Sequence, residues 1–241
     1  MQNKHPKVLL CCPTSDKKAY CDTDWFEMVS SLSYPNYDIF IADNSTGLQY
    51  SKKLQSKGFK VKHINNANKS FSQILAESHN ACREYAVKHN YDYIFHLESD
   101  VFPDTPNIIQ RLMEHNKQIT CAPYHIQQGE KSVLFAQQVD KHQVLGEYHL
   151  IVNSLYPAED LIFIDGKLKE IANGALGCVL IHKSVFSNVE FRYVKGANAY
   201  PDTYFYLDCY AKGYRVFMDT SLFCKHKNQQ YTEFNQVVNP K

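Results

Sequence analysis

The 241-residue chain has little net charge and lacks the apolar segments that mark membrane and secreted proteins. Its 26 Lys and Arg side chains nearly balance its 25 Asp and Glu side chains, which leaves a formal charge of +1. This balance gives no chain-wide electrostatic reason to bind nucleic acid or an anionic membrane. The polar N-terminus leads into a very short apolar run, so we expect neither a signal peptide nor a transmembrane segment, and a cytoplasmic, reducing location.

The chain also lacks the glycine-rich signatures of two large nucleotide-binding classes. It has no GxxxxGK[ST] loop and no GxGxxG after its first predicted strand, which disfavours P-loop NTPases and dinucleotide oxidoreductases. Nucleotidyltransferases usually carry a glycine- and lysine-rich first loop, and residues 13–16 do not resemble one.

Eight cysteines are spread over positions 11, 12, 21, 82, 121, 178, 209 and 224, with no CxxC pair. Most lie in apolar stretches of a chain much larger than a disulfide-stapled mini-protein, so we expect reduced, buried thiols. Cys11 and Cys12 are adjacent in a strand-like run. Alternation sends their side chains to opposite faces, which argues against a shared zinc ion.

The first half of the chain alternates strand-like and helix-like patterns, which is typical of βαβ units and a largely parallel sheet. Strands are predicted at 8–12, 37–42, 60–64, 93–97 and 119–122, and the clearest helix at 72–89. Beyond these we expect a hairpin-like insertion at 124–152, renewed order at 161–164 and a glycine-punctuated loop running into a strand at 172–181. A helix at 202–212 capped by Gly213 and strands at 215–218 and 222–224 complete the pattern.

Three polar clusters follow predicted strands, at 13–16, 43–46 and 98–100. In open parallel sheets, ligands bind beyond the carboxyl ends of the strands. The third cluster, Glu98-Ser99-Asp100, places two carboxylates one residue apart, and Mg²⁺ or Mn²⁺ commonly combines such groups with water and phosphate oxygens. A solvated turn uses the same residue types, so the pair does not decide the matter on its own.

Seven short motifs follow one another along the chain. They are Pro13-Thr14, Asp43-Asn44-Ser45, Asn80, Glu98-Ser99-Asp100, Asn173-Gly174-Ala175, Asp202-Thr203-Tyr204-Phe205 and His226. This ordered set resembles the family-2-type GT-A glycosyltransferases, including short viral and bacterial members. The resemblance implies a GT-A (Rossmann-like) α/β fold, with a mixed, mostly parallel sheet flanked by helices. It also implies a single domain over 1–241, with a nucleotide-binding half at 1–123 and an acceptor-side half at 124–241.

The resemblance further implies transfer of a sugar from a nucleotide-sugar donor, with UDP expected, to a hydroxyl acceptor. The residues expected to bind the donor are Pro13, Thr14, Asp43, Asn44, Asn80, Glu98, Ser99, Asn173 and Gly174. Asp100 and His226 are expected to hold Mn²⁺ or Mg²⁺. Because Glu-x-Asp departs from the commoner Asp-x-Asp, Glu98 is expected to face ribose or to reach the metal through water.

Asp202 matches the family's catalytic base, which in an inverting transfer takes the proton of the attacking hydroxyl. An Asp after Pro201 at a helix start also interacts well with the helix dipole, so a capping role is the alternative. Asp208, one and a half turns later, is the other candidate base. Tyr200, Tyr204 and Tyr206 are candidates to stack on an acceptor sugar, whereas Phe205 is expected in the core.

The expected acceptor is a saccharide or glycoconjugate. For a virus-encoded relative, a hydroxymethylated DNA base is the alternative acceptor, although the near-neutral charge disfavours nucleic acid. A non-catalytic carbohydrate-binding module with the same fold is the other reading, and the presence of Asp100, Asp202 and His226 favours the enzyme. The sequence does not indicate the donor sugar or the oligomeric state.

Overall fold

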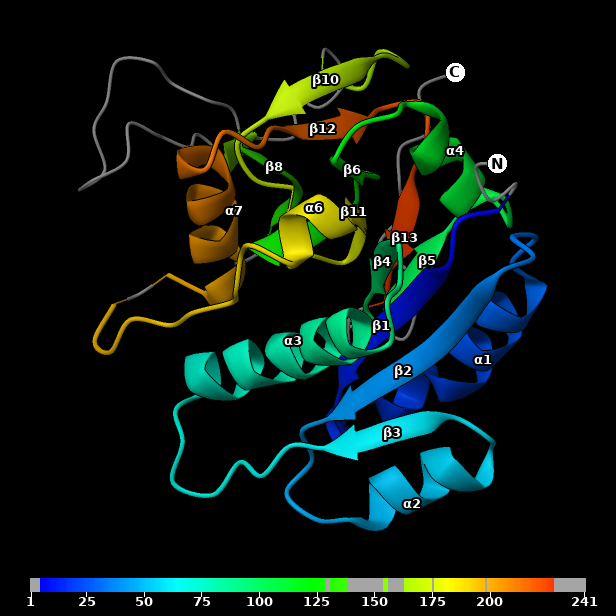
Figure 1. The fold of residues 1–241 in the computed structure, drawn as a ribbon, viewed down its shortest axis with the longest axis vertical. Coiled ribbons are helices and arrows are strands. Elements are labelled where there is room, and N and C mark those ends of the chain that lie inside the picture. The colour runs from blue at the N-terminus through cyan, green and yellow to red at the C-terminus, as the bar shows by residue number, and fades with distance from the viewer. Residues whose placement is uncertain are drawn as a thin grey trace.

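The computed structural model describes residues 5–128, 131–137, 154–155, 163–174, 176–197 and 199–227. Its centre is an eight-stranded sheet in the order β10-β12-β6-β11-β4-β1-β2-β3 (Figure 1). These strands are β1 (Val8–Thr14), β2 (Tyr37–Asp43), β3 (Lys60–His63), β4 (Tyr93–Leu97), β6 (Ile119–Cys121), β10 (Leu168–Ile171), β11 (Cys178–His182) and β12 (Val216–Asp219).

Most of the strands run in one direction. β1 is parallel to both β2 and β4, β2 is parallel to β3, and β6 is parallel to β12. β11 is antiparallel to β4 and to β6, and β10 is antiparallel to β12. The sheet is therefore mixed and mostly parallel, as predicted. Strands from both halves of the chain alternate within it, so the predicted halves share one sheet.

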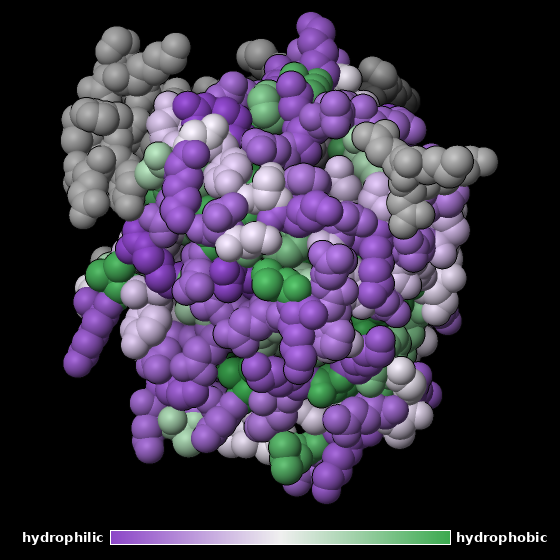
Figure 2. All heavy atoms as spheres, viewed as in Figure 1, coloured by the Kyte–Doolittle hydropathy of each residue, from purple (hydrophilic) through white to green (hydrophobic). Residues whose placement is uncertain are grey.

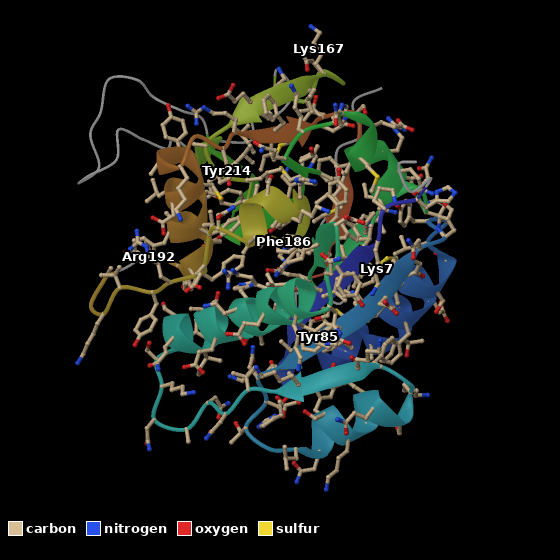
Figure 3. The ribbon with its side chains drawn as sticks, in the orientation of Figure 1. Lys7, Tyr85, Lys167, Phe186, Arg192 and Tyr214 are labelled. Atoms are coloured by element: carbon tan, nitrogen blue, oxygen red, sulfur yellow. The ribbon has the colours of Figure 1, made fainter. Side chains whose placement is uncertain are left out.

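Helices cover both faces of this sheet. One layer contains α3 (Phe71–Lys88), α6 (Lys183–Phe186) and α7 (Pro201–Ala211), and the other contains α1 (Asp22–Ser31), α2 (Gln49–Ser56) and α4 (Ile108–Glu114). The alternation of β1 sends Leu9 and Cys11 into the first layer's core and Leu10 and Cys12 into the second. Figure 3 shows Tyr85 of α3 and Phe186 of α6 on the same side of the sheet.

The local sequence explains the ends of the two helices that border the site. Ser70 precedes α3, and its hydroxyl accepts a hydrogen bond from the Gln73 N–H at 3.2 Å, as an N-cap does. Pro201 opens α7, where its missing N–H costs nothing. Gly213 follows α7 with φ of +85°, which confirms the predicted C-cap.

The eight cysteines are all buried and unpaired, as expected, and Cys11 and Cys12 face opposite layers. Within the described residues, no helix is both long and apolar enough to cross a membrane. The face drawn in Figure 2 is largely hydrophilic, with small, separate apolar spots, so the helices on that side turn their apolar surface toward the sheet.

Several elements differ from the sequence prediction. Helices α1, α2 and α4 and strands β5 (Val101–Pro103) and β10 were not predicted. The last strand, β13 (Cys224–His226), begins two residues later than expected, because its residues pair with β5, whereas 220–221 form the turn after β12 and 222–223 belong to no helix or strand. His226 therefore ends this strand instead of following it. The short β13–β5 ladder fixes the backbone beside Asp100.

The insertion after β6 contains an antiparallel sheet of β7 (His125–Gln128), β8 (Lys131–Gln137) and β9 (Ser154–Leu155). This confirms a hairpin in its described part, whereas 138–152, 161–162 and Ala175 lie outside the described residues.

A close contact joins the insertion to the main sheet. Tyr124, just before β7, is buried, and its hydroxyl accepts a hydrogen bond from the Gly177 N–H at 3.1 Å. A Cβ added at Gly177 would lie 2.5 Å from the Tyr124 ring, which leaves no room for a side chain. The carbonyl of Gly177 accepts from the Glu98 N–H at 3.0 Å. Gly177 therefore lets three segments meet.

We expect Gly177→Ala to lower the free energy of unfolding by about 1–3 kcal/mol, because the added methyl overlaps a buried ring. Urea denaturation measures the loss. Gly47→Ala is the matched control, since its Cβ would meet only the flexible end of Gln49. Equal stability of the two variants would contradict the close packing of Gly177 on Tyr124.

Candidate functional site

A pocket of about 240 Å³ lies at the carboxyl ends of β1 and β4. Its walls come from the strand ends, the start of α3, the insertion and the start of α7. The lining residues are Pro13, Phe71, Leu75, His79, Glu98, Tyr124, Ile126, Leu176, Tyr200, Pro201 and Asp202. Segments nearly two hundred residues apart in sequence thus meet at the edge where parallel sheets bind ligands.

Three of the predicted site residues line this pocket, namely Pro13, Glu98 and Asp202. Asp100 and His226 are not among the lining residues, but the charges of both act on the pKa of Glu98. Glu98 thus adjoins the pocket and feels the charges of the Asp100 and His226 pair, whereas the roles of these residues stay predictions.

Asp100 sits in the turn between β4 and β5 and is 1% exposed. Its Oδ2 atom lies 3.1 Å from His226 Nε2 and also accepts a hydrogen bond from the ammonium of Lys18. Lys18 belongs to the short 3₁₀ helix η1 (Asp16–Cys21), which follows β1. The Asp100 carbonyl accepts from the Lys227 N–H at 2.8 Å. Two basic side chains thus converge on one buried carboxylate.

Burial and neighbouring charges shift the pKa values of Asp100, His226 and Glu98. Burial alone raises the pKa of Asp100, but the hydrogen bond with His226 and the charge of Lys18 lower it below its ordinary value. Burial opposes the charge of His226, but the contact with Asp100 raises the pKa of that imidazole. For Glu98, burial and then the negative charge of Asp100 raise the pKa to about 7. Asp100 is therefore the stable anion of this cluster.

His226 is held in one ring orientation. Its Nδ1–H donates to the carbonyl of His125 at 2.8 Å, so Nε2 faces Asp100. A carbonyl on one ring nitrogen is the usual way to present the other nitrogen to a metal ion. The Tyr124 ring packs edge-on against the imidazole, with centroids 5.6 Å apart.

The donor set of Asp100 and His226 suits Mn²⁺ better than Mg²⁺, since Mn²⁺ accepts both carboxylate oxygen and imidazole nitrogen. The Lys18 ammonium on Oδ2 shows that this buried oxygen holds a positive charge. Among the described residues, no group of three or more His, Cys, Asp or Glu is placed to hold a metal. Two protein ligands fit a metal whose remaining ligands are phosphate oxygens and water.

The first two strand-end motifs are held by internal hydrogen bonds. The Thr14 and Ser99 hydroxyls lie 2.8 Å apart and tie β1 to the β4–β5 turn. Asp43 is fully buried, and its carboxylate accepts from Ser45 N–H at 2.9 Å and from the Ser51 hydroxyl at 2.5 Å. The Asn44 amide donates to the Ser78 hydroxyl at 3.2 Å. Nucleotide binding by these residues stays a prediction.

Asn80, Asn173 and Gly174 are not among the residues that line the pocket. The side chain of Asn80 donates to the Phe191 carbonyl at 2.7 Å and accepts from the Phe191 N–H at 2.9 Å, so it clamps the chain before α7. Asn173 is buried, and a Cβ at Gly174 would lie 2.5 Å from Cys121 Sγ. The small residue at 174 thus serves sheet packing, and Leu176 is the loop residue in the lining.

The two candidate bases on α7 have different surroundings. Asp202 lines the pocket and accepts from the Thr203 N–H at 2.8 Å, and burial raises its pKa. Asp208 lines a separate depression and pairs with Arg192 through two hydrogen bonds of 2.6 and 3.0 Å. The structure therefore places Asp208, the other candidate base, outside the pocket that Asp202 lines.

The aromatic residues around α7 separate into two groups. Phe205 and Tyr206 are buried in the core, which confirms the expectation for Phe205 and removes Tyr206 from any sugar contact. Tyr204 packs under the guanidinium of Arg192, 4.6 Å from its ring centroid. Tyr200 is 53% exposed at the pocket and meets Phe71 edge to face, with centroids 6.1 Å apart.

Among the polar residues of the site, Lys18, His79 and Tyr124 were not predicted from the sequence. Lys18 and Tyr124 each have a long-range partner that no local pattern encodes. His79 had a usable signal, because it falls four residues after Leu75 on the apolar face of the predicted helix.

No protein-family model and no curated protein sequence matches this chain. Solved structures do match in fold. S. aureus TarS 1-349 in complex with UDP-GlcNAc has a TM-score of 0.53 and 13% identity, and the match covers 96% of this chain and 62% of that one. The mannosyltransferase PcManGT from Pyrobaculum calidifontis, in complex with GDP-Man and Mn²⁺, has a TM-score of 0.52 and 10% identity, with coverage of 90% and 58%.

The chain spans less than two thirds of each of these structures. At such low identity the likeness concerns the fold. Together with the sheet order, it confirms the predicted GT-A fold.

We expect Lys18→Met to tighten Mn²⁺ binding in the absence of nucleotide by about tenfold or more, because the ammonium shares the Asp100 oxygen that the metal needs. Isothermal titration calorimetry measures the affinity. Lys17→Met, at an exposed neighbouring position, controls for the loss of one positive charge. Unchanged or weaker Mn²⁺ binding in the Lys18 variant would contradict the competition.

Proposed function

We propose that this chain is a metal-dependent, inverting glycosyltransferase. It moves a sugar from a nucleoside diphosphate sugar, with UDP as the expected nucleotide, to a hydroxyl group of a saccharide or glycoconjugate. The observation that carries the proposal is the strand-end pocket itself. It combines Asp202 and Glu98 on its wall with the Asp100 and His226 pair, whose charges act on Glu98.

The fold neighbours support the donor class. TarS was solved with UDP and with UDP-GlcNAc, and PcManGT with GDP-Man and Mn²⁺. Those ligands belong to those proteins, and they agree on a nucleoside diphosphate sugar. We carry this donor class over to the strand-end pocket because its metal end holds the oxygen and nitrogen ligands that Mn²⁺ accepts.

Asp100 and His226 would hold the metal, which when bound stabilises the negative charge that develops on the departing diphosphate. Without a ligand, the Lys18 ammonium pairs with the Asp100 oxygen. When the metal binds Asp100, this ammonium would be able to pair with the same diphosphate. Thr14 and Ser99 hold the two strand ends at a fixed separation, so the chain orients this end of the site before any ligand arrives.

Asp202 is the proposed base. One of its oxygens is held by the Thr203 N–H, which orients the carboxylate at the start of α7. Its raised pKa makes it a stronger proton acceptor than an ordinary aspartate. An inverting transfer requires one such carboxylate on the acceptor side, and Asp202 lies in the pocket lining.

The pocket wall suits a saccharide acceptor. The carboxylates of Glu98 and Asp202 accept hydrogen bonds from hydroxyl groups, and the exposed rings of Tyr200 and Phe71 offer apolar faces to a sugar ring. We favour this acceptor over a hydroxymethylated DNA base. The eight unpaired thiols support action in a reducing compartment.

We expect Asp100→Asn to lower Mn²⁺-dependent hydrolysis of a UDP- or GDP-sugar at least about 100-fold, since the amide removes the charge that binds the metal. Initial rates are compared with those of Asp104→Asn, a nearby carboxylate that lines a different depression. Full turnover by the Asp100 variant would overturn the assignment of the metal site.

We expect Asp202→Asn to keep donor binding but to lose transfer by a factor of about 10²–10⁴, the usual contribution of a positioned base. Asp208→Asn, on the same helix but outside the pocket, is the control that should stay active. Donor affinity and transfer rate are measured on both variants. Transfer by the Asp202 variant at a near wild-type rate would place the base elsewhere.

A further inference from the structure

Two buried histidines lie side by side between α3 and β4. His79 Nδ1 is 2.8 Å from His96 Nε2, and the ring centroids are 4.8 Å apart. His96 Nδ1 is in turn 2.7 Å from the carbonyl oxygen of Leu176. His96 is 1% exposed and His79 is 6% exposed, and His79 lines the pocket. The chain of contacts therefore runs from a backbone carbonyl to the pocket wall.

This series of hydrogen bonds fixes the position of the ring N–H proton on each histidine. A carbonyl oxygen only accepts, so His96 must carry its proton on Nδ1 and donate it to Leu176. In the neutral ring, Nε2 of His96 is then a bare acceptor, and His79 must supply the proton between the rings from its own Nδ1. Nε2 of His79 is consequently left without a proton.

Both rings stay neutral near pH 7. Burial lowers the pKa of His96 to about 4, against the hydrogen bond to Leu176, which raises it. Burial and then the neighbouring His96 lower the pKa of His79 well below its ordinary value. The assignment of protons therefore holds under ordinary assay conditions.

The other contacts of the His79 ring leave Nε2 as the ring nitrogen without a described hydrogen bond. One face of the ring stacks on Phe191, with centroids 4.8 Å apart and an angle of 29°. Nδ1 faces His96, and Nε2 lies across the ring from it. Within the described part of the chain, no hydrogen bond reaches Nε2 of His79. Of the two ring nitrogens, Nε2 is therefore the one left for a ligand in the pocket that His79 lines.

We propose that His79 recognises a carbohydrate hydroxyl by accepting its hydrogen bond at Nε2, and that His96 is the positioning residue that keeps this nitrogen unprotonated. This inference deepens the proposed function and rests on it for the identity of the ligand. It adds a residue that discriminates among sugars and a reason for the buried histidine on β4.

A hydroxyl is the group that this arrangement selects. A bare, neutral nitrogen accepts a hydrogen bond but neither donates to a phosphate oxygen nor attracts its charge. The apolar side chains of Leu75, Leu176 and Phe71 line the same pocket and offer this nitrogen no hydrogen-bond donor. A sugar that lacks the matching hydroxyl would leave this nitrogen buried and unsatisfied, which is how polar sites reject deoxy analogues.

The first test reads the proton positions in the ligand-free protein by ¹⁵N NMR of histidine side chains. We expect His79 at pH 7 as the neutral Nδ1–H form, with a pyridine-like Nε2 signal that disappears in His79→Gln. His96→Asn keeps a donor to Leu176 but removes the acceptor, so the preference of His79 for Nδ1–H should be lost. A protonated Nε2 in the wild-type chain overturns the proposal, whatever the enzyme's activity.

The second test identifies the hydroxyl. UDP-N-acetylglucosamine, GDP-mannose and their monodeoxy sugars serve as donor probes, and methyl glycosides with their deoxy forms serve as acceptor probes. His79→Asn removes the nitrogen that His79→Gln replaces with an amide oxygen. We expect His79→Asn to lower kcat/KM about 3- to 10-fold for the parent sugar, and His79→Gln to restore part of that loss.

For one monodeoxy sugar, the wild type and His79→Asn should be equal, because the interaction is already absent. The donor series and the acceptor series tell which sugar supplies the hydroxyl. If the two proteins differ by the same factor for every sugar in both series, hydroxyl recognition by His79 is wrong. If no probe is turned over, the proposed function fails in these assays, and the NMR result still decides the state of His79.

Discussion

The site depends on one buried carboxylate that two basic side chains from distant segments contact. Asp100 is almost inaccessible, and it stays ionised because Lys18 and His226 both meet the same oxygen. Leaving a buried charge unpaired would cost several kcal/mol. The η1 helix, the β4–β5 turn and β13 must therefore pack together, and their packing sets the metal end of the pocket.

The rest of the pocket follows from how two layers of the fold reach the same sheet edge. The β4 strand contributes His96 to one layer and continues into Glu98 and Asp100, and α3 lays His79 against it. Gly177 lets Tyr124 and the Glu98 backbone come together. The β4 strand thus holds both ends of the site. Ligand groups therefore meet side chains that are already oriented.

Much of this architecture could be predicted from the sequence, because the apolar runs and helical spacing that mark β1, β2, β4, α3 and α7 are local signals. The strand-end motifs were found for the same reason. Lys18 was missed because its role depends on a partner 82 residues away. Asn80 was assigned to the donor from the resemblance, yet its amide is held by the backbone of Phe191, which lies 111 residues later.

The choice between Asp202 and Asp208 shows the same limit. Both lie on one helix, and only the rotation of α7 and the position of Arg192 decide which carboxylate faces the pocket. Helix rotation follows from packing of the core residues Phe205 and Cys209, which the sequence marks as apolar without saying what they contact. Residue types could therefore be predicted, but not their partners.

The central claim is that this pocket binds a nucleoside diphosphate sugar together with a divalent metal. Thermal denaturation of the wild-type chain with UDP-, GDP- and TDP-sugars, each with and without Mn²⁺, tests it most directly, because a ligand that binds only the folded state raises the melting temperature. We expect one nucleotide class to raise the melting temperature in the presence of Mn²⁺ and to raise it much less in its absence. A melting temperature that no sugar nucleotide changes, with or without Mn²⁺, would contradict it.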